Sequence, residues 1–393
     1  MKLNAESIAL LDKVKKTFPF LMPQKIKMRH LDYLAMAGAG VAREQNDTQI
    51  TPEHILIGAH RAWPADFVNL ICTRLRLDPA KKAQFQKKAA ELDYVSVETL
   101  LDDLKTIAEK YGTEIQEDRL RPILDCYKQV IETGAIYIKA TTRDLTPKEF
   151  FIRPGHAGRW FDMAAIAKNC GIADFDDNPA YLAYSSICRK IDSLGSMVDI
   201  SAQGKIHKLY TFTPRFQPPL RKIQNCKYVP ASIAKNIPMI ESWGFKRFSI
   251  FGADLIHNSM NFYCYTDQTT LDQAKIEAMF AKLGFPMPSD AMLAEMVDAA
   301  MIYFTFTHES DRIERICFTR VYEESMEKAI ALAPSLKKYI EESPIKSAKR
   351  NLLLGFTFSE KGHYLKFELD YKASVFIPKV MKYSGLYCDP KSF

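Results

Sequence analysis

The sequence lacks several patterns that would assign a class of protein at once. It has no apolar run near 18 residues, which is the length a helix needs to cross a membrane. It has no P-loop and no GxGxxG motif, so the common phosphate cradles of nucleotide-binding proteins are missing. The net charge is +7, yet no long block of Lys or Arg occurs. We therefore expect no membrane span and no nucleic-acid partner.

The eight cysteines are scattered and include no CxxC pair. Their spacing gives little support to a structural zinc site. We expect reduced cysteines in the core of a cytoplasmic protein, because cytosolic thiols stay reduced. The first segment, MKLNAESIALLDKVKK, carries charges throughout, so we expect an amphipathic helix there and not a signal peptide.

Polar and apolar residues alternate in paired runs over most of the chain. In IYFTFTHESDRIERICFTRVY, residues 302–322, two β-rich runs flank a polar turn at 308–311. Successive side chains of a strand point to opposite sides, so this hairpin has an apolar face and a polar face. The polar face carries Tyr303 and Arg315. With the turn centred near Glu309, we expect Tyr303 to lie opposite Arg315.

The same hairpin pattern recurs at a regular spacing of roughly 50–60 residues, which indicates an internal structural repeat. The turns are centred near Thr142, Gln203, Leu255, Glu309 and Lys361. Helical segments lie between the hairpins and can cover their apolar faces, so the polar faces must enclose a wet lumen. We predict an α+β fold: a closed antiparallel barrel of about ten strands surrounded by helices. A membrane barrel leaves no place for such helices, and a parallel α/β barrel does not pair its strands in hairpins.

The first part of the chain shows helical patterns and no hairpin. Thr51 caps one expected helix, with Pro52 at its first position and Glu53 in its first turn. We predict two domains: a small helical N-terminal domain, residues 1–95, and the barrel, residues 96–393. The N-terminal domain is expected to bind a protein partner or to mediate self-association.

Five local motifs in this order resemble a known family. They are HKLYTFTP, VPASIAKN, NSMNFYCY, IERICF and AKRNLLLGFTFSEKGHYLK. The family is the soluble aromatic prenyltransferases of the ABBA (αββα) type, in the bacterial branch that acts on phenols, naphthalenes and phenazines. The resemblance covers about residues 96–386. It implies an enzyme that binds a prenyl diphosphate in the barrel lumen and transfers the prenyl group to an electron-rich aromatic acceptor, releasing diphosphate.

The resemblance also assigns roles by position. Residues that look like the diphosphate-binding group are Lys208, Arg315, Lys366, Asn261, Arg153 and His257. Tyrosines that look like the catalytic, cation-shielding group are Tyr263, Tyr303 and Tyr210. The acceptor pocket, in the far half of the lumen, is expected to contain Ser249, Ala300, Met301, Thr319, Glu368 and Asp370.

The metal requirement depends on the first hairpin. Magnesium-dependent members of the family carry an Asp there, where this chain has Glu149. Arg153 has the same strand parity, and a guanidinium can neutralise the charge that a metal neutralises elsewhere. We predict that no cofactor is required, with Mg²⁺ on Glu149 as the alternative. The chain has no DDxxD run, so the magnesium cluster of the trans-prenyl synthases is not expected.

Each assignment has a plainer alternative. A lone strand lysine is usually solvated, but Lys208, Arg315 and Lys366 lie on three hairpins and favour a shared anion site, since unpaired buried cations are costly. The tyrosines could merely fill the lumen, and Glu149 and Arg153 could simply pair with each other. The alternative function is a non-catalytic barrel that carries a phosphorylated or isoprenoid ligand.

Overall fold

The structure is a computed structural model. It describes residues 2–18, 31–32, 34–35, 37–39, 41–42, 45–62, 65–93, 95–143, 150–157, 162–191, 193, 195–213, 218–323, 326–347 and 350–372. No helix among these residues is both long and apolar enough to span a bilayer.

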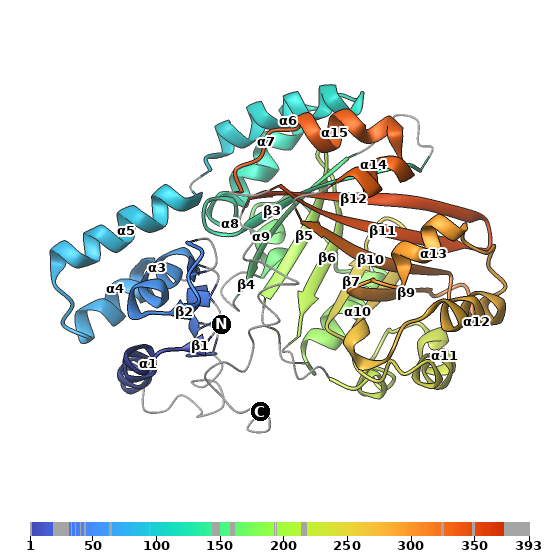
Figure 1. The fold of residues 1–393 in the computed structure, drawn as a ribbon, viewed down its shortest axis with the longest axis horizontal. Helices are drawn as coiled ribbons and strands as arrows, with labels where there is room; N and C mark the ends of the chain where they lie inside the picture. Colours follow the sequence, from blue (N-terminus) through green and yellow to red (C-terminus); the bar gives the residue numbers. More distant parts are fainter. Residues whose placement is uncertain are drawn as a thin grey trace.

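Ten antiparallel strands form a closed barrel, as predicted (Figure 1). Neighbours in the sequence are neighbours in the barrel, and the last strand pairs with the first to close it. The strands are β3 (Ala135–Thr141), β4 (Phe151–Ala157), β5 (Gly195–Ser201), β6 (Ile206–Phe212), β7 (Ile250–Asp254), β8 (Ser259–Tyr265), β9 (Met301–Thr307), β10 (Arg315–Glu323), β11 (Asn351–Ser359) and β12 (Gly362–Lys372).

Helices cover the outside of the barrel. They are α6 (Val97–Tyr111), α7 (Glu117–Cys126), α8 (Lys128–Thr133), α9 (Met163–Asn169), α10 (Pro179–Cys188), α11 (Ala231–Ser242), α12 (Gln273–Leu283), α13 (Asp290–Met296), α14 (Glu327–Leu332) and α15 (Lys337–Glu342). Helix α6 shows why they form: Ser96 caps its first turn, Gly112 ends it in the left-handed conformation, and its leucines recur at three- and four-residue spacing on the buried face.

The main hydrophobic core lies between the strands and these helices. The outward-facing residues Phe251, Phe262, Phe304 and Phe318 belong to this core and are at most 1% exposed. Because side chains alternate along a strand, the residues between them face the lumen. The expected pairing of Tyr303 with Arg315 is wrong by two residues, since Arg315 lies opposite Thr305 and Tyr303 opposite Cys317. A shift of two residues keeps every side chain on its predicted face.

The N-terminal part of the chain is mainly helical. Its described elements are α1 (Ala5–Thr17), α3 (Pro52–Ala62), α4 (Ala65–Arg74) and α5 (Pro79–Asp93), with a parallel pair of two-residue strands, β1 (Lys2–Leu3) and β2 (Gln49–Ile50). The described residues between 31 and 42 are helical as well. Figure 1 shows these elements gathered on one side of the barrel. The division into two domains at residue 95 stays a prediction.

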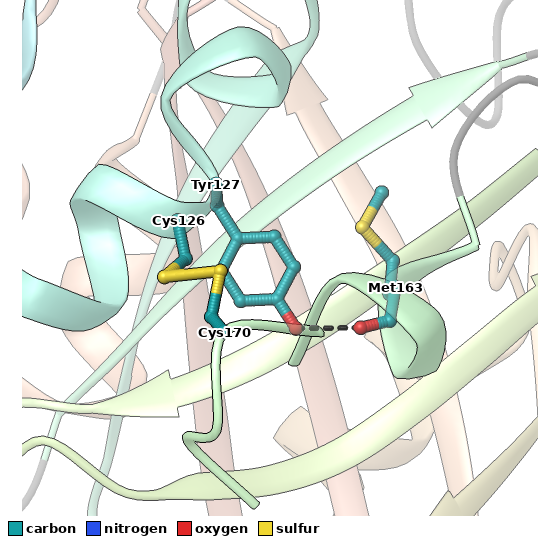
Figure 2. Close-up of a disulfide and its surroundings, with 4 residues drawn as sticks. All are labelled: Cys126, Tyr127, Met163 and Cys170. Carbon is teal, nitrogen blue, oxygen red and sulfur yellow. Dashed lines mark hydrogen bonds between the residues drawn. A yellow bond between two sulfur atoms is a disulfide. The ribbon is translucent and has the colours of Figure 1, made fainter. Parts of the chain in front are cut away.

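A disulfide joins Cys126, at the end of α7, to Cys170, just after α9 (Figure 2). The expectation that all the cysteines are reduced is therefore wrong for this pair. Beside the disulfide, the Tyr127 hydroxyl donates a hydrogen bond to the carbonyl oxygen of Met163 at 2.7 Å. The link spans 44 residues, and closing a loop of that length restricts the unfolded chain by about 4 kcal/mol in the chain-entropy model. It ties together α7 and α9, two helices that also contact each other.

Candidate active site

The lumen contains two cavities that meet inside the barrel. The polar cavity lies at the end where the hairpins turn and is lined by the basic residues Lys139, Arg143, Arg153, Lys208, Arg315 and Lys366. The apolar cavity lies at the other end, where the strands connect to helices, and is lined by residues such as Met197, Ile250, Met301, Val321 and Leu353. The apolar cavity has a volume of about 850 Å³ and the polar cavity one of about 860 Å³, and part of each volume is continuous with solvent.

The structure brings all six predicted diphosphate-binding residues to the polar cavity. Lys208, Arg315, Lys366, Asn261, Arg153 and His257 line it. Six basic side chains stand against two acidic ones, Asp254 and Glu368, in this lining. The excess of positive charge in a partly closed space is suited to a polyanion.

Two of the predicted diphosphate-binding cations have no carboxylate partner among the described residues. Arg315 and Lys366 are half-buried and line the cavity. The Lys366 ammonium donates a hydrogen bond to the Tyr303 hydroxyl, and no described carboxylate pairs with either cation. A half-buried cation without a counter-ion is costly unless a ligand supplies the negative charge.

Lys208 differs because Asp254 partly neutralises it. The Lys208 Nζ to Asp254 Oδ2 distance is 2.8 Å, and His257 Nδ1 lies 3.1 Å from Asp254 Oδ1. Burial opposes ionisation of Asp254, but Lys208 and His257 hold the pKa of its carboxyl well below the usual range. Lys208 and His257 therefore form a fixed wall of the cavity.

Arg153 is held even more firmly. Its guanidinium donates to Asp199 and to Glu368, and its Nη2 donates to the Tyr210 hydroxyl at 3.0 Å. The Tyr210 hydroxyl in turn donates to Asp199 Oδ2 at 2.9 Å. The charge of Arg153 is thus shared by two carboxylates. Its predicted alternative partner, Glu149, lies outside the described residues.

Lys139 and Asp199 complete this buried network, and the sequence analysis missed both. Asp199 is fully buried, and the Lys139 ammonium donates to it. Burial opposes ionisation of Asp199, but Arg153 and Lys139 hold its carboxyl pKa well below the usual range. Burial, aided by Arg153, lowers the pKa of Lys139 to about 8. Strand alternation was the available signal, because Lys139 shares a face with Tyr137.

The three predicted catalytic tyrosines lie where the cavities meet. Tyr210, Tyr263 and Tyr303, here called the tyrosine belt, line both cavities. The ring centroids of Tyr263 and Tyr303 are 4.4 Å apart, and those of Tyr210 and Tyr263 are 6.3 Å apart. Burial raises the pKa of all three phenols, so they stay neutral at physiological pH.

Tyr364 is a further polar-cavity residue that the sequence analysis did not assign. The Lys366 ammonium lies 5.3 Å from its ring centroid, and the Arg143 guanidinium lies 5.9 Å away. Burial opposes its ionisation, but Lys366, Arg315 and Lys208 together lower its phenol pKa to about 8. Its ring therefore lies near both Arg143 and Lys366 in the polar cavity.

Four of the six predicted acceptor residues line the apolar cavity: Met301, Thr319, Glu368 and Asp370. Ser249 and Ala300 line neither cavity. The Ser249 hydroxyl donates to the Tyr263 carbonyl oxygen, and its neighbour Ile250 lines the cavity instead. Because strand side chains alternate, choosing the wrong one of two neighbours reverses the face.

Within the described ranges, no group of three or more His, Cys, Asp or Glu side chains could hold an ion. Asp254 and Glu368, the acidic residues of the polar cavity, are paired with Lys208 and Arg153.

Comparisons with known proteins agree with this geometry. The family model "Aromatic prenyltransferase Orf2" matches residues 95–379. The 5,10-dihydrophenazine-1-carboxylate 9-dimethylallyltransferase of Streptomyces anulatus is 24% identical over 263 residues, which cover 65% of this chain and 87% of that protein. The flaviolin linalyltransferase of Streptomyces virginiae is 23% identical over 234 residues, 58% of this chain and 76% of that protein.

A solved structure is also similar. The 6-dimethylallyltryptophan synthase of Micromonospora olivasterospora matches 71% of this chain and 99% of its own, with 13% identity and a TM-score of 0.44. A TM-score this low supports no argument, and the fold is defined by the strand order. The family model covers most of the chain, including the whole barrel. This chain therefore belongs to the Orf2-type family of ABBA aromatic prenyltransferases.

Proposed function

We propose that this protein transfers a prenyl group from dimethylallyl or geranyl diphosphate to an electron-rich aromatic acceptor. The reaction is a Friedel–Crafts-type substitution in which the allylic C–O bond breaks, a C–C bond to the ring forms, and diphosphate leaves. The observation that carries the proposal is the order along the lumen: a cationic cavity, the tyrosine belt, and an apolar cavity.

Ionisation of the donor takes place at the polar cavity. As the allylic C–O bond breaks, negative charge grows on the diphosphate oxygens, and fixed positive groups stabilise that charge. Arg315 and Lys366 can do this without first leaving a carboxylate partner among the residues that the structure describes. Lys208 and Lys139 add positive potential while remaining bound to Asp254 and Asp199.

The tyrosine belt then shields the allylic cation. A cation over an aromatic face gains about 0.5–2 kcal/mol, more where water is excluded. The three phenols are buried and neutral, so they provide π-faces and do not capture the cation as phenolates. The Tyr303 hydroxyl also accepts a hydrogen bond from the Lys366 ammonium, which links the shield to the departing diphosphate.

The acceptor occupies the apolar cavity. Its ring stacks near Tyr263, on the side away from the cations, and attacks the allylic carbon. Glu368 faces both cavities, and its carboxylate is fixed by Arg153, so it can orient an acceptor hydroxyl or amine. The ring proton leaves to water or to a weak base such as this carboxylate.

The donor length is proposed from the relatives and from one bulky residue. The two relatives above are named for a dimethylallyl and a linalyl transfer, five and ten carbons respectively. Phe151 lines the polar cavity beside His207, with ring centroids 4.9 Å apart, and limits the space for a longer chain.

Catalysis is proposed to be metal-independent. Arg315, Lys366, Lys208 and Lys139 supply the positive charge that a metal supplies in other enzymes. In the alternative, Mg²⁺ binds through Glu149. We also propose that the protein acts in the cytoplasm without a nucleic-acid partner.

The test is a direct assay. Purified protein is mixed in turn with dimethylallyl, geranyl and farnesyl diphosphate, with Mg²⁺ or with a chelator, and with a panel of phenols, naphthalenes, phenazines and indoles. Mass spectrometry identifies the products. We expect a prenyl adduct from the five- or ten-carbon donor that survives the chelator. An adduct only with Mg²⁺ assigns Glu149 as a ligand.

The alternative function has its own outcome. A carrier of a phosphorylated or isoprenoid ligand binds geranyl diphosphate without turnover on any acceptor. If the assay gives no adduct and the protein does not bind diphosphate, the transferase proposal is contradicted. A carrier of a neutral ligand has no need of Lys208, Arg315 and Lys366 together, which is why the transferase is preferred.

A further inference from the structure

We propose that the N-terminal helical region closes the apolar end of the barrel and forms the end wall of the acceptor cavity. It therefore helps to set which acceptors fit. The part about acceptors rests on the proposed function, whereas the closure itself does not.

The first observation is the burial of lumen residues at the ends of the strands. Met197, Phe212, Ile250 and Met301 lie at or near the ends of β5, β6, β7 and β9 that connect to the segments outside the barrel. Inward-facing apolar residues at an open mouth would meet water, but these four are at most 4% exposed. At the other end, the inward-facing Phe151, Arg315 and Tyr364 are only half-buried, although strands surround them equally. Something covers the apolar end.

The second observation identifies the cover. These residues belong to one continuous hydrophobic cluster with the N-terminal region, which contributes Leu11 and Val14 of α1, Leu31 and Leu34, Ile55 of α3, and Val68, Ile71 and Cys72 of α4. This cluster is separate from the main core between strands and outer helices. Figure 1 shows the N-terminal elements on that side of the barrel.

The third observation connects this cover to the cavity. Tyr137, Met197, Tyr210, Ile250 and Met301 belong to the shared cluster and also line the apolar cavity. One side of each residue packs within the cluster, and another side faces the space proposed for the acceptor. Packing that fixes their rotamers therefore also fixes the shape of the cavity.

The energetics favour closure at this end only. Apolar area removed from water stabilises the closed form by about 25 cal/mol per Å². Arg315, Lys366 and Tyr364 at the other end would lose hydration if they were covered without a counter-ion. The family match begins at residue 95, so the covering residues precede the part of the chain that defines the family.

Methionine oxidation in the full-length protein tests the closure without any substrate. The chain has reporters in each environment: Met197 and Met301 at the covered mouth, Met260 and Met279 in the main core, and Met287, which is 54% exposed. Hydrogen peroxide is the probe, and peptide mass spectrometry measures each rate. In the unaltered protein we expect Met287 to oxidise quickly and the other four slowly.

The deciding variant is Leu34→Glu, which places a charge in the shared cluster where Leu34 is 1% exposed. We expect oxidation of Met197 and Met301 to rise about tenfold or more as the cover opens, with Met260 and Met279 unchanged. The matched control is Leu70→Glu on α4, where the side chain is 44% exposed, and it should change none of these rates.

Labelling of Cys72 with a maleimide shows whether the N-terminal region was disturbed, because Cys72 is buried within the same cluster. The proposal is overturned if Cys72 becomes reactive while Met197 and Met301 stay protected. A change in oligomeric state with the same protection assigns the region to self-association instead. If Met260 also oxidises faster, the barrel has opened, and the milder Leu34→Ala decides by the ratio of Met301 to Met260.

A binding measurement separates this proposal from the proposed function. Calorimetry with inorganic diphosphate should give the same affinity for Leu34→Glu and for the unaltered chain, because the polar cavity is at the other end. With an acceptor found in the product assay, Leu34→Glu should raise its KM and leave the KM of the prenyl diphosphate unchanged. If diphosphate fails to bind to either protein, the proposed function fails while the methionine result still stands.

Discussion

The two ends of the lumen are built from the same strands, but electrostatics dominates at one end and apolar packing at the other. At the polar end, buried and half-buried charges are either paired within the wall, as in Lys139–Asp199–Arg153, or left for a ligand, as in Arg315 and Lys366. At the other end, apolar side chains exclude water by packing with helices from outside the family match. The difference teaches that a single barrel can present a cationic cavity at one end and an apolar cavity at the other. The experiments below break or sharpen that difference.

The largest effect is expected from Asp199→Asn. The change removes the carboxylate that pairs with Lys139 and Arg153 and leaves both cations buried. Losing one partner of a buried ion pair costs about 3–5 kcal/mol in the free energy of unfolding. Denaturant unfolding at pH 7 measures the loss. The control Asp311→Asn breaks an exposed pair with Lys235 and should cost about 1 kcal/mol or less. Equal costs for the two variants would contradict the buried network.

Arg315→Ala should leave the fold intact and strongly reduce turnover. The variant removes a cation that has no described carboxylate partner, so stability changes little, while transition-state stabilisation falls by about 3 kcal/mol, or about 10²-fold in kcat/KM. Steady-state kinetics and diphosphate calorimetry measure both effects. The control is Arg312→Ala in the same hairpin turn, where the side chain is exposed and pairs with Glu360. If diphosphate affinity and turnover both survive Arg315→Ala, the anion site lies elsewhere.

A smaller effect is expected where the two cavities meet. Tyr263→Leu removes a π-face from the tyrosine belt, and the loss of one cation–π contact of about 1–2 kcal/mol slows kcat by about tenfold. Tyr263→Phe keeps the ring and should retain most of the rate. Diphosphate affinity should be equal in both variants, because the change lies beyond the cations. Equal rates for Leu and Phe would show that the ring only fills space.

The smallest effect concerns pH and is confined to the polar end. Tyr364 has a pKa lowered to about 8, so it gains a negative charge as the pH rises through that value. Lys139 also has a pKa lowered to about 8, so it loses a positive charge over the same range. Both changes reduce the positive potential, while phosphate groups, whose second pKa is about 6, are already almost fully ionised over this range.

Affinity for a prenyl diphosphate should therefore fall by about tenfold between pH 7 and pH 9. The reason is that one or two favourable charge interactions with the diphosphate, of about 1 kcal/mol each, are lost. Tyr364→Phe should remove part of that fall. The binding of an uncharged aromatic in the apolar cavity should not change with pH. An affinity for diphosphate that rises through pH 8 would contradict both assignments.

Residue patterns were sufficient for the barrel because alternation is a local property. The paired runs gave ten strands, their order and the inward face of Lys208, Arg315, Lys366 and the tyrosine belt. The pattern failed where a decision depended on a single residue. Ser249 was chosen over Ile250 at a strand end, and the turn between β9 and β10 shifted the expected register by two.

Alternation by itself determined which side chains face the lumen, since period two follows from the geometry of an extended backbone. Only closure of the barrel decided which of them meet. Lys139 and Asp199 are 60 residues apart, and Arg153 and Asp199 are 46 apart, so no local pattern pairs them. The disulfide and the N-terminal cover of the apolar end have the same origin. Each is a contact between segments that lie far apart in the sequence. A sequence pattern does not contain the spatial distance between such segments.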